Sequence, residues 1–542
     1  MTVYRNFIDR RTLATPTWYD AKRAREVLAA YNGGSGSGQP ADEFVAQSIV
    51  PAGTAAGRDF SYIAPDLPEL TPVNCVGCME CVQNCPDSAI FGKVVTIETL
   101  EQELASVKDE AERERIRAQY VQTTKYFDAY EKKRAKDESA PAGALFTIAI
   151  DPTKCKGCGE CVPVCGDHDA LRMVKKTGAN LPGYFDMWNF YQQLPATPKE
   201  YINSKVVVDI MLKEEAILYT GGGGSCMGCG EASVVRQTVA ATSERVGSNF
   251  GVVAATGCNT VFSSTYPYNP FLVPWMNSLF ENAPTVAMGI RAAWDQQGHS
   301  DRALWVFGGD GAMLDIGFQA LSRMLTSGMN IKVLILDTQV YSNTGGQSST
   351  ATFIGQEAKM SSHGKVVMGK TERRKEIGQI ALMHPHVYVA QTVGAMSGHF
   401  YKSVLGALDF DGPAVVNVYT TCQPEHGVAD DKSYDQARMA VESRAFPLFI
   451  YDPTKGRTIR ERMSLQGNPS MNRTWAAKKE KSGAERTTTF VDWARTEARF
   501  AKHFGRDGSP SESLLRSQED RLANWWQLQE LAGIRNLDLE GA

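Results

Sequence analysis

The sequence lacks long apolar runs and an excess of either charge. No stretch of about 18 consecutive apolar residues occurs, and the N-terminus has no apolar segment of the kind that a secretion signal needs. The 57 Lys and Arg residues are balanced by 61 Asp and Glu residues, so we expect no basic field that attracts nucleic acid or anionic lipid. These absences predict a cytoplasmic chain that neither crosses a membrane nor binds nucleic acid.

The composition is that of an ordinary globular protein with room for several domains. Hydrophobic residues make up 43% and charged residues 22% of the 542 positions. These fractions exclude collagen-like, coiled-coil and disordered chains. At about 150 residues per domain, the length predicts three or four domains.

Cysteine spacing is the most specific chemical signal in the sequence. Two groups share the spacing C-x2-C-x2-C-x3-C, and their members are Cys75, Cys78, Cys81 and Cys85, then Cys155, Cys158, Cys161 and Cys165. The remaining cysteines are one C-x2-C pair and two single residues, namely Cys226, Cys229, Cys258 and Cys422.

The repeated spacing predicts two [4Fe–4S] clusters. Disulfide bonds are disfavoured for a large chain without a secretion signal, and zinc sites group thiolates in pairs. In two-cluster ferredoxins the fourth cysteine of each run ligates the other cluster. We therefore expect one cluster on Cys75, Cys78, Cys81 and Cys165, and the second on Cys155, Cys158, Cys161 and Cys85. Gly166 is a departure, because proline usually follows the fourth cysteine.

The region from about residue 225 has the pattern of a parallel α/β sheet. Four short apolar runs are typical of buried strands, at residues 251–255, 303–307, 331–336 and 414–419. Each run is followed by a chemically distinctive segment, in order Cys258, Gly309-Asp310-Gly311, residues 337–343 and Cys422. Ligands bind beyond the carboxyl ends of parallel strands, so we expect these segments to form one site.

The Gly309-Asp310-Gly311 turn favours a diphosphate site. Glycines let the backbone approach a diphosphate at a helix N-terminus, and Asp310 is a hard oxygen ligand for Mg²⁺. One βαβ unit joins this turn to a loop with Thr338 and Asn343, which is the pattern of a thiamine diphosphate (TPP) site. Residues 364–371 also fit the P-loop expression G-x4-G-K-[ST], but no buried strand precedes them, and we interpret that match as coincidence.

The predicted fold class is α/β, with a parallel-sheet TPP-binding domain that follows a ferredoxin-like α+β domain. We expect an N-terminal segment or linker at 1–70, the ferredoxin-like domain at 71–180, a linker at 181–224, the TPP-binding domain at 225–455 and a C-terminal extension for packing or subunit contact at 456–542. Residues 33–38 predict a flexible connector, and residues 101–136 predict a charged helical insertion.

At these motifs the chain resembles the pyruvate:ferredoxin oxidoreductase (2-oxoacid:ferredoxin oxidoreductase) family, over about residues 70–453. The strings that carry the resemblance are Cys226-Met227-Gly228-Cys229-Gly230-Glu231, Ala255-Thr256-Gly257-Cys258, Asn277-Ser278-Leu279-Phe280-Glu281, Gly309-Asp310-Gly311, residues 337–347, Val441-Glu442-Ser443 and Tyr451-Asp452-Pro453.

The resemblance implies a third cluster beside TPP and Mg²⁺. The implied ligands of the cluster are Cys226, Cys229, Cys258 and Cys422, and those of Mg²⁺ are Asp310, Thr338 and the backbone carbonyl of Val340. The implied TPP contacts are Glu231, Cys258, Gly309, Asp310, Gly311, Ala312, Thr338, Val340, Ser342 and Asn343. Two features depart from the family: Ala312 replaces a Trp or similar residue, and the segment after Cys422 is one residue longer.

The resemblance also implies an activity and partners. The family converts a 2-oxoacid, here first of all pyruvate, to acyl-CoA and CO₂, and passes the electrons through three [4Fe–4S] clusters to ferredoxin or flavodoxin, in either direction. A separate pyrimidine-binding domain carries the activating Glu in the family, and we find only one α/β region of TPP type. We therefore assign no catalytic residue to this chain and expect partner subunits in an oligomer of heteromers. The alternatives are an enzyme for 2-oxoglutarate or another 2-oxoacid, and an electron-transfer subunit without TPP catalysis.

Overall fold

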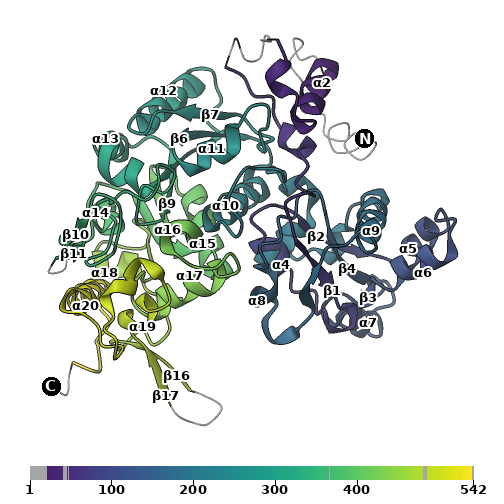
Figure 1. Cartoon of the computed structure of the whole chain (residues 1–542). Coiled ribbons are helices and arrows are strands. Elements are labelled where there is room, and N and C mark those ends of the chain that lie inside the picture. The colour runs from purple at the N-terminus through teal and green to yellow at the C-terminus, as the bar shows by residue number, and fades with distance from the viewer. Residues whose placement is uncertain (1–20, 41–45, 47, 365–366, 480–484, 540–542) are drawn as a thin grey trace. The chain divides into compact units, whose positions relative to one another are not determined.

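The computed structural model describes residues 21–40, 46, 48–364, 367–479 and 485–539. The chain folds into two compact units (Figure 1). The first unit comprises Met1–Gly228 and Phe262–Val273, and the second comprises Cys229–Val261 and Pro274–Ala542. Within the described ranges, none of the helices combines the length and the apolar character that a membrane crossing requires.

Two antiparallel sheets in the first unit connect the two cysteine motifs crosswise. β1 (Asp66–Leu70), before the first motif, pairs with β5 (Leu171–Lys175), which follows the second motif. β2 (Ile90–Val95), after the first motif, pairs with β4 (Leu145–Ile150), which precedes the second. Each motif is therefore anchored to strands that flank the other one.

The first unit also contains a third strand, which extends the β2–β4 sheet, and several helices and turns. They are α2 (Ala21–Asn32), α4 (Glu80–Asn84), α5 (Ile97–Leu104), α6 (Glu110–Arg117), β3 (Val121–Gln122), α7 (Ala129–Arg134), α8 (Cys161–Cys165) and α9 (Leu181–Gln193), with 3-10 turns at Gly36–Gly38, Thr54–Gly57, Pro72–Asn74, Gly166–His168, Lys199–Tyr201, Val207–Leu212 and Glu214–Ala216 and a π-helical turn at Thr124–Asp128.

Several predicted segments of the first unit have more structure than expected. The stretch predicted as a linker, residues 181–224, contains α9, whose Trp188 stacks on Tyr191 and packs against Phe91 of β2. The predicted insertion is mainly helical, but β3 adds a short strand to β4. The predicted Gly/Ser connector folds as a 3-10 turn with Gly36 buried under Tyr31.

An eight-stranded, mostly parallel sheet forms the second unit. Its strand order is β15-β14-β12-β13-β9-β8-β6-β7, and only β14 and β15 run antiparallel to their neighbours. The strand bounds are β6 (Phe250–Ala255), β7 (Trp275–Ser278), β8 (Ala303–Gly309), β9 (Lys332–Asp337), β12 (Tyr388–Val393), β13 (Ala414–Tyr419), β14 (Phe449–Tyr451) and β15 (Met463–Ser464). All four runs expected to be buried strands are strands of this sheet.

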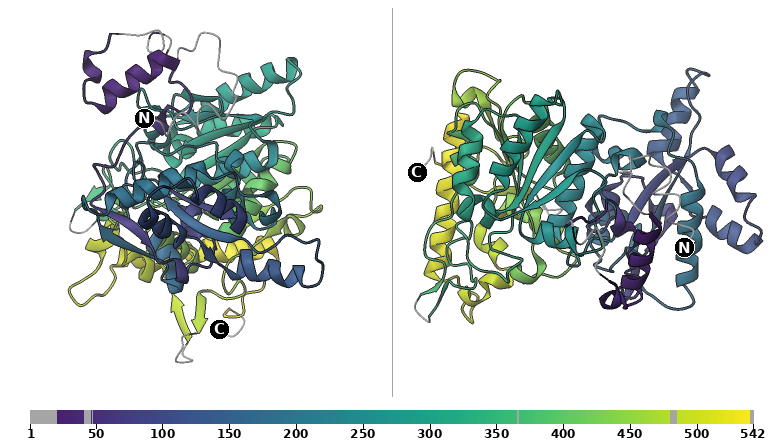
Figure 2. Two further views of the ribbon diagram at one scale, coloured as in Figure 1. Left: turned by 90° about the vertical axis from the view of Figure 1, so that its right-hand side faces the viewer. Right: turned by 90° about the horizontal axis from the view of Figure 1, so that it is seen from above.

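Helices cover both faces of the sheet (Figure 2). On one face, α12 (Ala283–Gln296), α13 (Phe318–Thr326), α14 (Ile377–Leu382) and α20 (Glu512–Ala532) contribute to one apolar core with the strands. On the other face, α15 (Ser397–Asp409) packs on β12, and α10 (Gly230–Val246) packs on α15.

The second unit also contains shorter elements. They are α11 (Cys258–Ser264, which begins in it), a π-helical turn at Gly311–Ile316, β10 (Ser362–His363), β11 (Met368–Gly369), α16 (Gln423–His426), α17 (Ser433–Glu442), α18 (Ile459–Arg462), β16 (Ala476–Lys479), β17 (Glu485–Thr488), α19 (Phe490–Ala494) and a 3-10 turn at Ala498–His503.

The C-terminal helix α20 is part of the second unit's interior. The side chain of Ser511 caps its first turn, and Gly533, with φ +68°, ends it in the left-handed region. Trp525 and Leu528 are buried in the core that also contains Val333 and Ile335 of β9. This part of the predicted C-terminal extension, residues 456–542, therefore packs on the sheet.

The segment that fits the P-loop expression has another structure. Residues 365 and 366 lie outside the described residues, and the residues around them form the hairpin of β10 and β11. Lys370 donates to the carbonyls of Ser349, Thr350 and Thr352 at 3.0–3.1 Å. Because the Lys370 ammonium group donates its hydrogen bonds to these three carbonyls, Lys370 has a structural role in the second unit.

Candidate functional site

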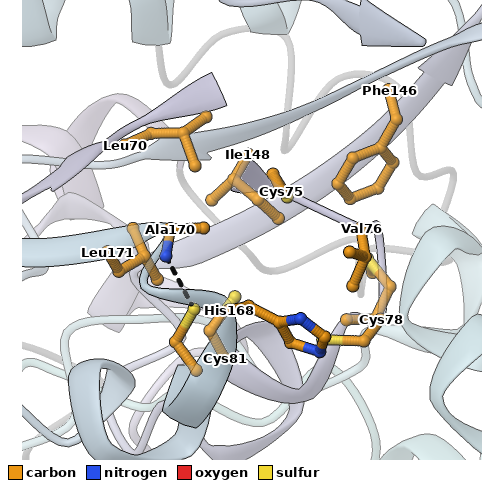
Figure 3. A pocket seen from close by; sticks show the side chains of 12 residues that line it. Leu70, Cys75, Val76, Cys78, Cys81, Phe146, Ile148, His168, Ala170 and Leu171 are labelled. Carbon is orange, nitrogen blue, oxygen red and sulfur yellow. Dashed lines mark hydrogen bonds between the residues drawn. The ribbon is translucent and has the colours of Figure 1, made fainter. Parts of the chain in front are cut away.

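Two cavities in the first unit are each lined by four cysteines. The first (Figure 3) contains Cys75, Cys78 and Cys81 of the first motif together with Cys165 of the second. The other contains Cys155, Cys158 and Cys161 of the second motif together with Cys85 of the first. The structure thus groups the thiols three and one, in the sets that the sequence predicts as cluster ligands.

The crosswise pairing of the strands explains this grouping. Each fourth cysteine lies at the end of a short helix, α4 or α8, and these two helices pack together. The fourth cysteine of each motif accepts a hydrogen bond of the same kind: Ala89 N–H donates to Cys85 Sγ, and Ala170 N–H donates to Cys165 Sγ, both at 3.3 Å. In Figure 3 a dashed line starts at the labelled Ala170. Hydrogen bonds of this kind to cysteine sulfur tune the potential of an iron–sulfur cluster.

The two thiol sets fit the iron–sulfur clusters that their spacing predicts, because each cavity offers four cysteines and needs a group of positive charge. Burial raises the pKa of Cys75 to about 11 and of Cys155 to about 12, so thiolates at these positions need positive charge beside them.

One pocket in the second unit gathers the predicted TPP contacts. All ten of those residues line it, together with Tyr341 of the same 338–343 loop. Four further lining residues, Thr256, Gly257, Phe280 and Thr344, were not among the predicted contacts. The pocket lies where β6, β8 and β9 end, as expected for parallel strands. β6 leads to Cys258, β8 leads to Asp310, and β9 leads to Thr338.

Three oxygen atoms at the base of the pocket are arranged as a cation site. Thr338 Oγ1 lies 3.1 Å from Asp310 Oδ1 and 3.0 Å from the carbonyl oxygen of Val340. Octahedral Mg²⁺ with bonds of about 2.0–2.1 Å places neighbouring ligand oxygens about 2.9 Å apart. One hydroxyl hydrogen cannot serve both neighbours at once, whereas a cation between the three oxygens satisfies all of them. The donor set therefore fits Mg²⁺.

The electrostatics of the pocket also favour a bound cation. Burial, together with the carboxylate of Asp337, raises the pKa of Asp310 to about 7. Asp337 is itself paired with the buried guanidinium of Arg374, so it is not available to a ligand. Burial, with Asp310 adding, raises the pKa of Glu231 to about 8, and Glu231 Oε1 is buried without a hydrogen-bond partner. An orphaned oxygen in the pocket is an acceptor or donor position that a bound cofactor would satisfy.

The cysteines implied for the third cluster are partly brought together. Cys229 is the N-cap of α10, and the adjacent Gly230 N–H donates to the carbonyl of Thr421, the residue before Cys422. Cys258 lines the same pocket as Ser342, whose hydroxyl bonds to the Cys422 thiol. Cys226 is exposed and belongs to the first unit. The assignment of all four cysteines to one ligand set stays a prediction.

Gly311 is required by packing inside the second unit. A Cβ atom at this position would lie 2.3 Å from the ring of Tyr341, which rests on the turn and donates from its hydroxyl to the Gly311 carbonyl at 3.4 Å. The Gly-Asp-Gly signal is therefore explained here by the close approach of an aromatic ring, in addition to any approach of a diphosphate. No local sequence pattern identifies Tyr341 as its partner.

Comparison with known proteins supports the identity of the pocket. Residues 255–418 match the family described as "Thiamine pyrophosphate enzyme, C-terminal TPP binding domain". The chain is 37% identical over 234 residues to the pyruvate synthase subunit PorB of Pyrococcus furiosus, a match that covers 42% of this chain and 70% of that subunit. The chain belongs to the pyruvate and 2-oxoacid:ferredoxin oxidoreductase family.

Longer members of this family align with more of the chain at lower identity. The pyruvate:ferredoxin oxidoreductase of Moorella thermoacetica is 28% identical over 512 residues, which covers 79% of this chain and 40% of that protein. A probable pyruvate-flavodoxin oxidoreductase of Escherichia coli is 26% identical over 517 residues, covering 82% of this chain and 41% of that protein. The chain thus spans about two fifths of these longer relatives.

Proposed function

We propose that this chain is the TPP- and iron–sulfur-containing subunit of a pyruvate:ferredoxin oxidoreductase. The reaction is the oxidative decarboxylation of pyruvate with CoA to acetyl-CoA and CO₂, which releases two electrons to ferredoxin or flavodoxin. The observation that carries the proposal is the pocket of the second unit, which all ten predicted contacts line and in which three of them supply an oxygen set that fits Mg²⁺. The names of the relatives support pyruvate as the substrate.

The roles of the chain's own residues follow from the pocket. Asp310, Thr338 and the Val340 carbonyl would hold Mg²⁺, and the Gly309–Gly311 turn would lie against the diphosphate. Glu231 would meet the cofactor through its unpartnered Oε1. When bound, TPP supplies the electron sink that makes loss of CO₂ from a 2-oxoacid possible.

The cysteine sets account for the oxidation. The reaction releases two electrons, and iron–sulfur clusters accept them one at a time. The two cavities of the first unit would hold two clusters, and Cys226, Cys229, Cys258 and Cys422 would hold a third beside the pocket. A partner subunit would supply the pyrimidine-binding domain, in keeping with the relative that is named as a subunit.

The test is anaerobic purification of the chain with its co-purifying partners, followed by assays of a panel of 2-oxoacids with CoA and a viologen dye. We expect dye reduction to be fastest with pyruvate. Asp310→Ala removes a charged ligand of the predicted Mg²⁺ site, so it should lose bound Mg²⁺ and TPP and lower turnover by at least about 100-fold. Its iron content should equal that of the wild type, because no cysteine changes.

Asp431→Ala, which changes a partly exposed acid in the same unit, is the matched control and should behave as the wild type. Full turnover by Asp310→Ala without bound TPP or Mg²⁺ would contradict the proposal and leave an electron-transfer subunit as the better interpretation. A preference for 2-oxoglutarate over pyruvate would correct the substrate alone.

A further inference from the structure

Gln339 lies between two of the predicted Mg²⁺ ligands, Thr338 and Val340, and has an unusual backbone. Its φ of +60° is in the left-handed region, which a residue with a Cβ atom rarely adopts. The conformation turns the Val340 carbonyl back toward the hydroxyl of Thr338. A backbone of this kind persists only where the surroundings hold it, so the contacts of Gln339 decide the geometry of the ligand set.

Both the nitrogen and the oxygen of the buried Gln339 side-chain amide are hydrogen-bonded. Its Nε2 donates to the carbonyl of Asp337, at the end of β9, at 2.5 Å. Its Oε1 accepts from both terminal nitrogens of Arg499 at 3.1 Å. Arg499 is in turn fixed by Glu497, whose Oε2 accepts from Arg499 Nε at 2.6 Å. Gln339, Glu497 and Arg499 are all buried, so each of these contacts is shielded from water.

A second arm of the same network reaches Thr338. His426 Nε2 lies 2.9 Å from the Thr338 carbonyl, which can only accept, so Nε2 carries the hydrogen. His426 Nδ1 lies 3.8 Å from Glu497 Oε1, and Tyr419 donates to that same oxygen at 3.1 Å. Glu497 therefore holds Arg499, which supports Gln339, and also holds Tyr419, whose ring lies 6.0 Å from the ring of the histidine that supports Thr338.

Glu497 and Arg499 come from the C-terminal part of the chain. They lie in and just before the 3-10 turn at Ala498–His503, about 80 residues beyond the segment 255–418 that matches the TPP-binding domain. We propose that Glu497 and Arg499 are positioning residues, through which the C-terminal segment fixes the 338–340 loop in the conformation that binds Mg²⁺ and TPP. This inference rests on the proposed function, because it assigns the loop to that cofactor.

Arg499→Lys tests the inference with the least disturbance. Lysine keeps a positive charge beside Glu497, but its single ammonium group cannot replace the planar guanidinium group, which donates to both Glu497 and Gln339. We expect the dissociation constant of TPP, measured by calorimetry with Mg²⁺ in excess, to rise about tenfold or more, as for other residues that orient metal ligands. The full-length chain with its co-purifying partners is first freed of cofactor by dialysis against a chelator.

Arg444→Lys is the matched control. Arg444 is equally buried in the second unit, but its guanidinium donates to the carbonyls of Thr474, Pro469 and Ser470. We expect this variant to lower the melting temperature with less than a twofold change in TPP affinity. If Arg499→Lys is too unstable, the pair Glu497→Gln with Arg499→Met leaves no buried charge without its partner and should show the same loss of affinity.

The outcomes separate the two proposals. A wild-type chain that binds no TPP with Mg²⁺ overturns the proposed function. A wild-type chain that binds TPP, together with Arg499→Lys and Glu497→Gln/Arg499→Met variants of unchanged affinity, overturns the positioning role and leaves the pair with a purely structural one. Weaker binding by the Arg499 variants, with unchanged binding by Arg444→Lys, supports the inference.

Discussion

The two units build their candidate sites in different ways. In the first unit, each cavity collects four thiols from two short motifs, and three of the four come from one loop and helix. In the second unit, the pocket collects oxygen atoms and a thiol from segments that follow three strands, with residues as distant in sequence as Glu231 and Asn343. The first arrangement depends mainly on local spacing, and the second depends on the topology of the sheet.

This difference affects what supports each site. A thiol set made by a local loop needs only the partner motif to supply the fourth cysteine, and the crosswise strands β1–β5 and β2–β4 provide it. An oxygen set at a sheet edge has no such local frame. Its loop is held by side chains from elsewhere, including Arg374 and Arg499. We expect substitutions far from the pocket to affect the second site more readily than the first.

The strongest test of this comparison is the pairing of the thiols. If each cavity holds one cluster, Cys75→Ala and Cys165→Ala should remove the same cluster, and Cys85→Ala should remove the other, because the cavities group the thiols in this way. Each variant should lose about four irons per chain. Electron paramagnetic resonance of the reduced protein should show the same missing signal in the first two variants and a different one in the third.

Sequential pairing within each motif would give another pattern, in which Cys75→Ala and Cys85→Ala share the missing signal. That result would remove the crosswise arrangement from the first unit. Where an alanine variant does not fold, the corresponding serine variant keeps an oxygen ligand and should change the signal of the same cluster.

The cysteine sets and the four strands could be predicted from the sequence because both are local signals. The thiol spacing fits one cofactor class, and runs such as 414–419 are buried along their whole length in the sheet. Asp310, Thr338 and Asn343 could be placed at the pocket because they follow predicted strands of one βαβ unit. The other contacts came instead from a resemblance to a family, because composition and spacing alone do not distinguish Ser342 from any other polar residue in a loop.

The rest could not be predicted because it depends on contacts between distant segments. Nothing near Gly311 indicates that Tyr341 packs on it, and nothing near Gln339 indicates that Arg499 supports it. Residues 181–224 have few sequence signals of a domain, yet the rings of Trp188 and Tyr191 fill space beside Phe91. Such packing depends on the tertiary structure, and neither the periodicity of hydrophobic residues nor the secondary-structure propensity of a segment predicts it.

The stability of the first unit is also expected to depend on a buried ion pair outside its thiol sets. Lys156, within the second motif, lies 2.6 Å from Asp87 and donates to the carbonyls of Gly223 and Ser225 at 3.0 and 2.7 Å. Lys156→Met leaves the buried Asp87 without its partner, which typically costs about 3–5 kcal/mol. We expect this loss in the unfolding free energy of the anaerobic full-length chain, measured with a chemical denaturant.

Asp87→Asn combined with Lys156→Met removes both charges and should recover most of the lost stability. Arg172→Met is the control, because Arg172 and Glu69 form an exposed ion pair in the same unit and should contribute little. A Lys156→Met variant as stable as the wild type would mean that the thiol sets hold the first unit without this pair, and the contrast between the two units would become sharper.

The smallest expected effect concerns the scaffold of the second unit. His399 of α15 lies with Nδ1 2.9 Å from the hydroxyl of Thr392 in β12, and its Nε2 is buried without a partner. Burial, with Lys402 adding, lowers the pKa of His399 to about 4, below the value of about 6.5 in an unfolded chain. The unfolded state therefore binds the proton more readily, so this contribution to stability is complete above pH 6.5 and is lost as the pH falls toward 4.

At pH 5 the difference in pKa corresponds to a loss of about 2 kcal/mol relative to pH 7.5. His399→Gln keeps a neutral polar group in place and removes the titration, so its unfolding free energy should fall by about 2 kcal/mol less than that of the wild type over this range. Equal losses in both proteins would show that His399 is hydrated in the folded state. Water would then enter between α15 and β12, the strand that pairs with β13 in the sheet.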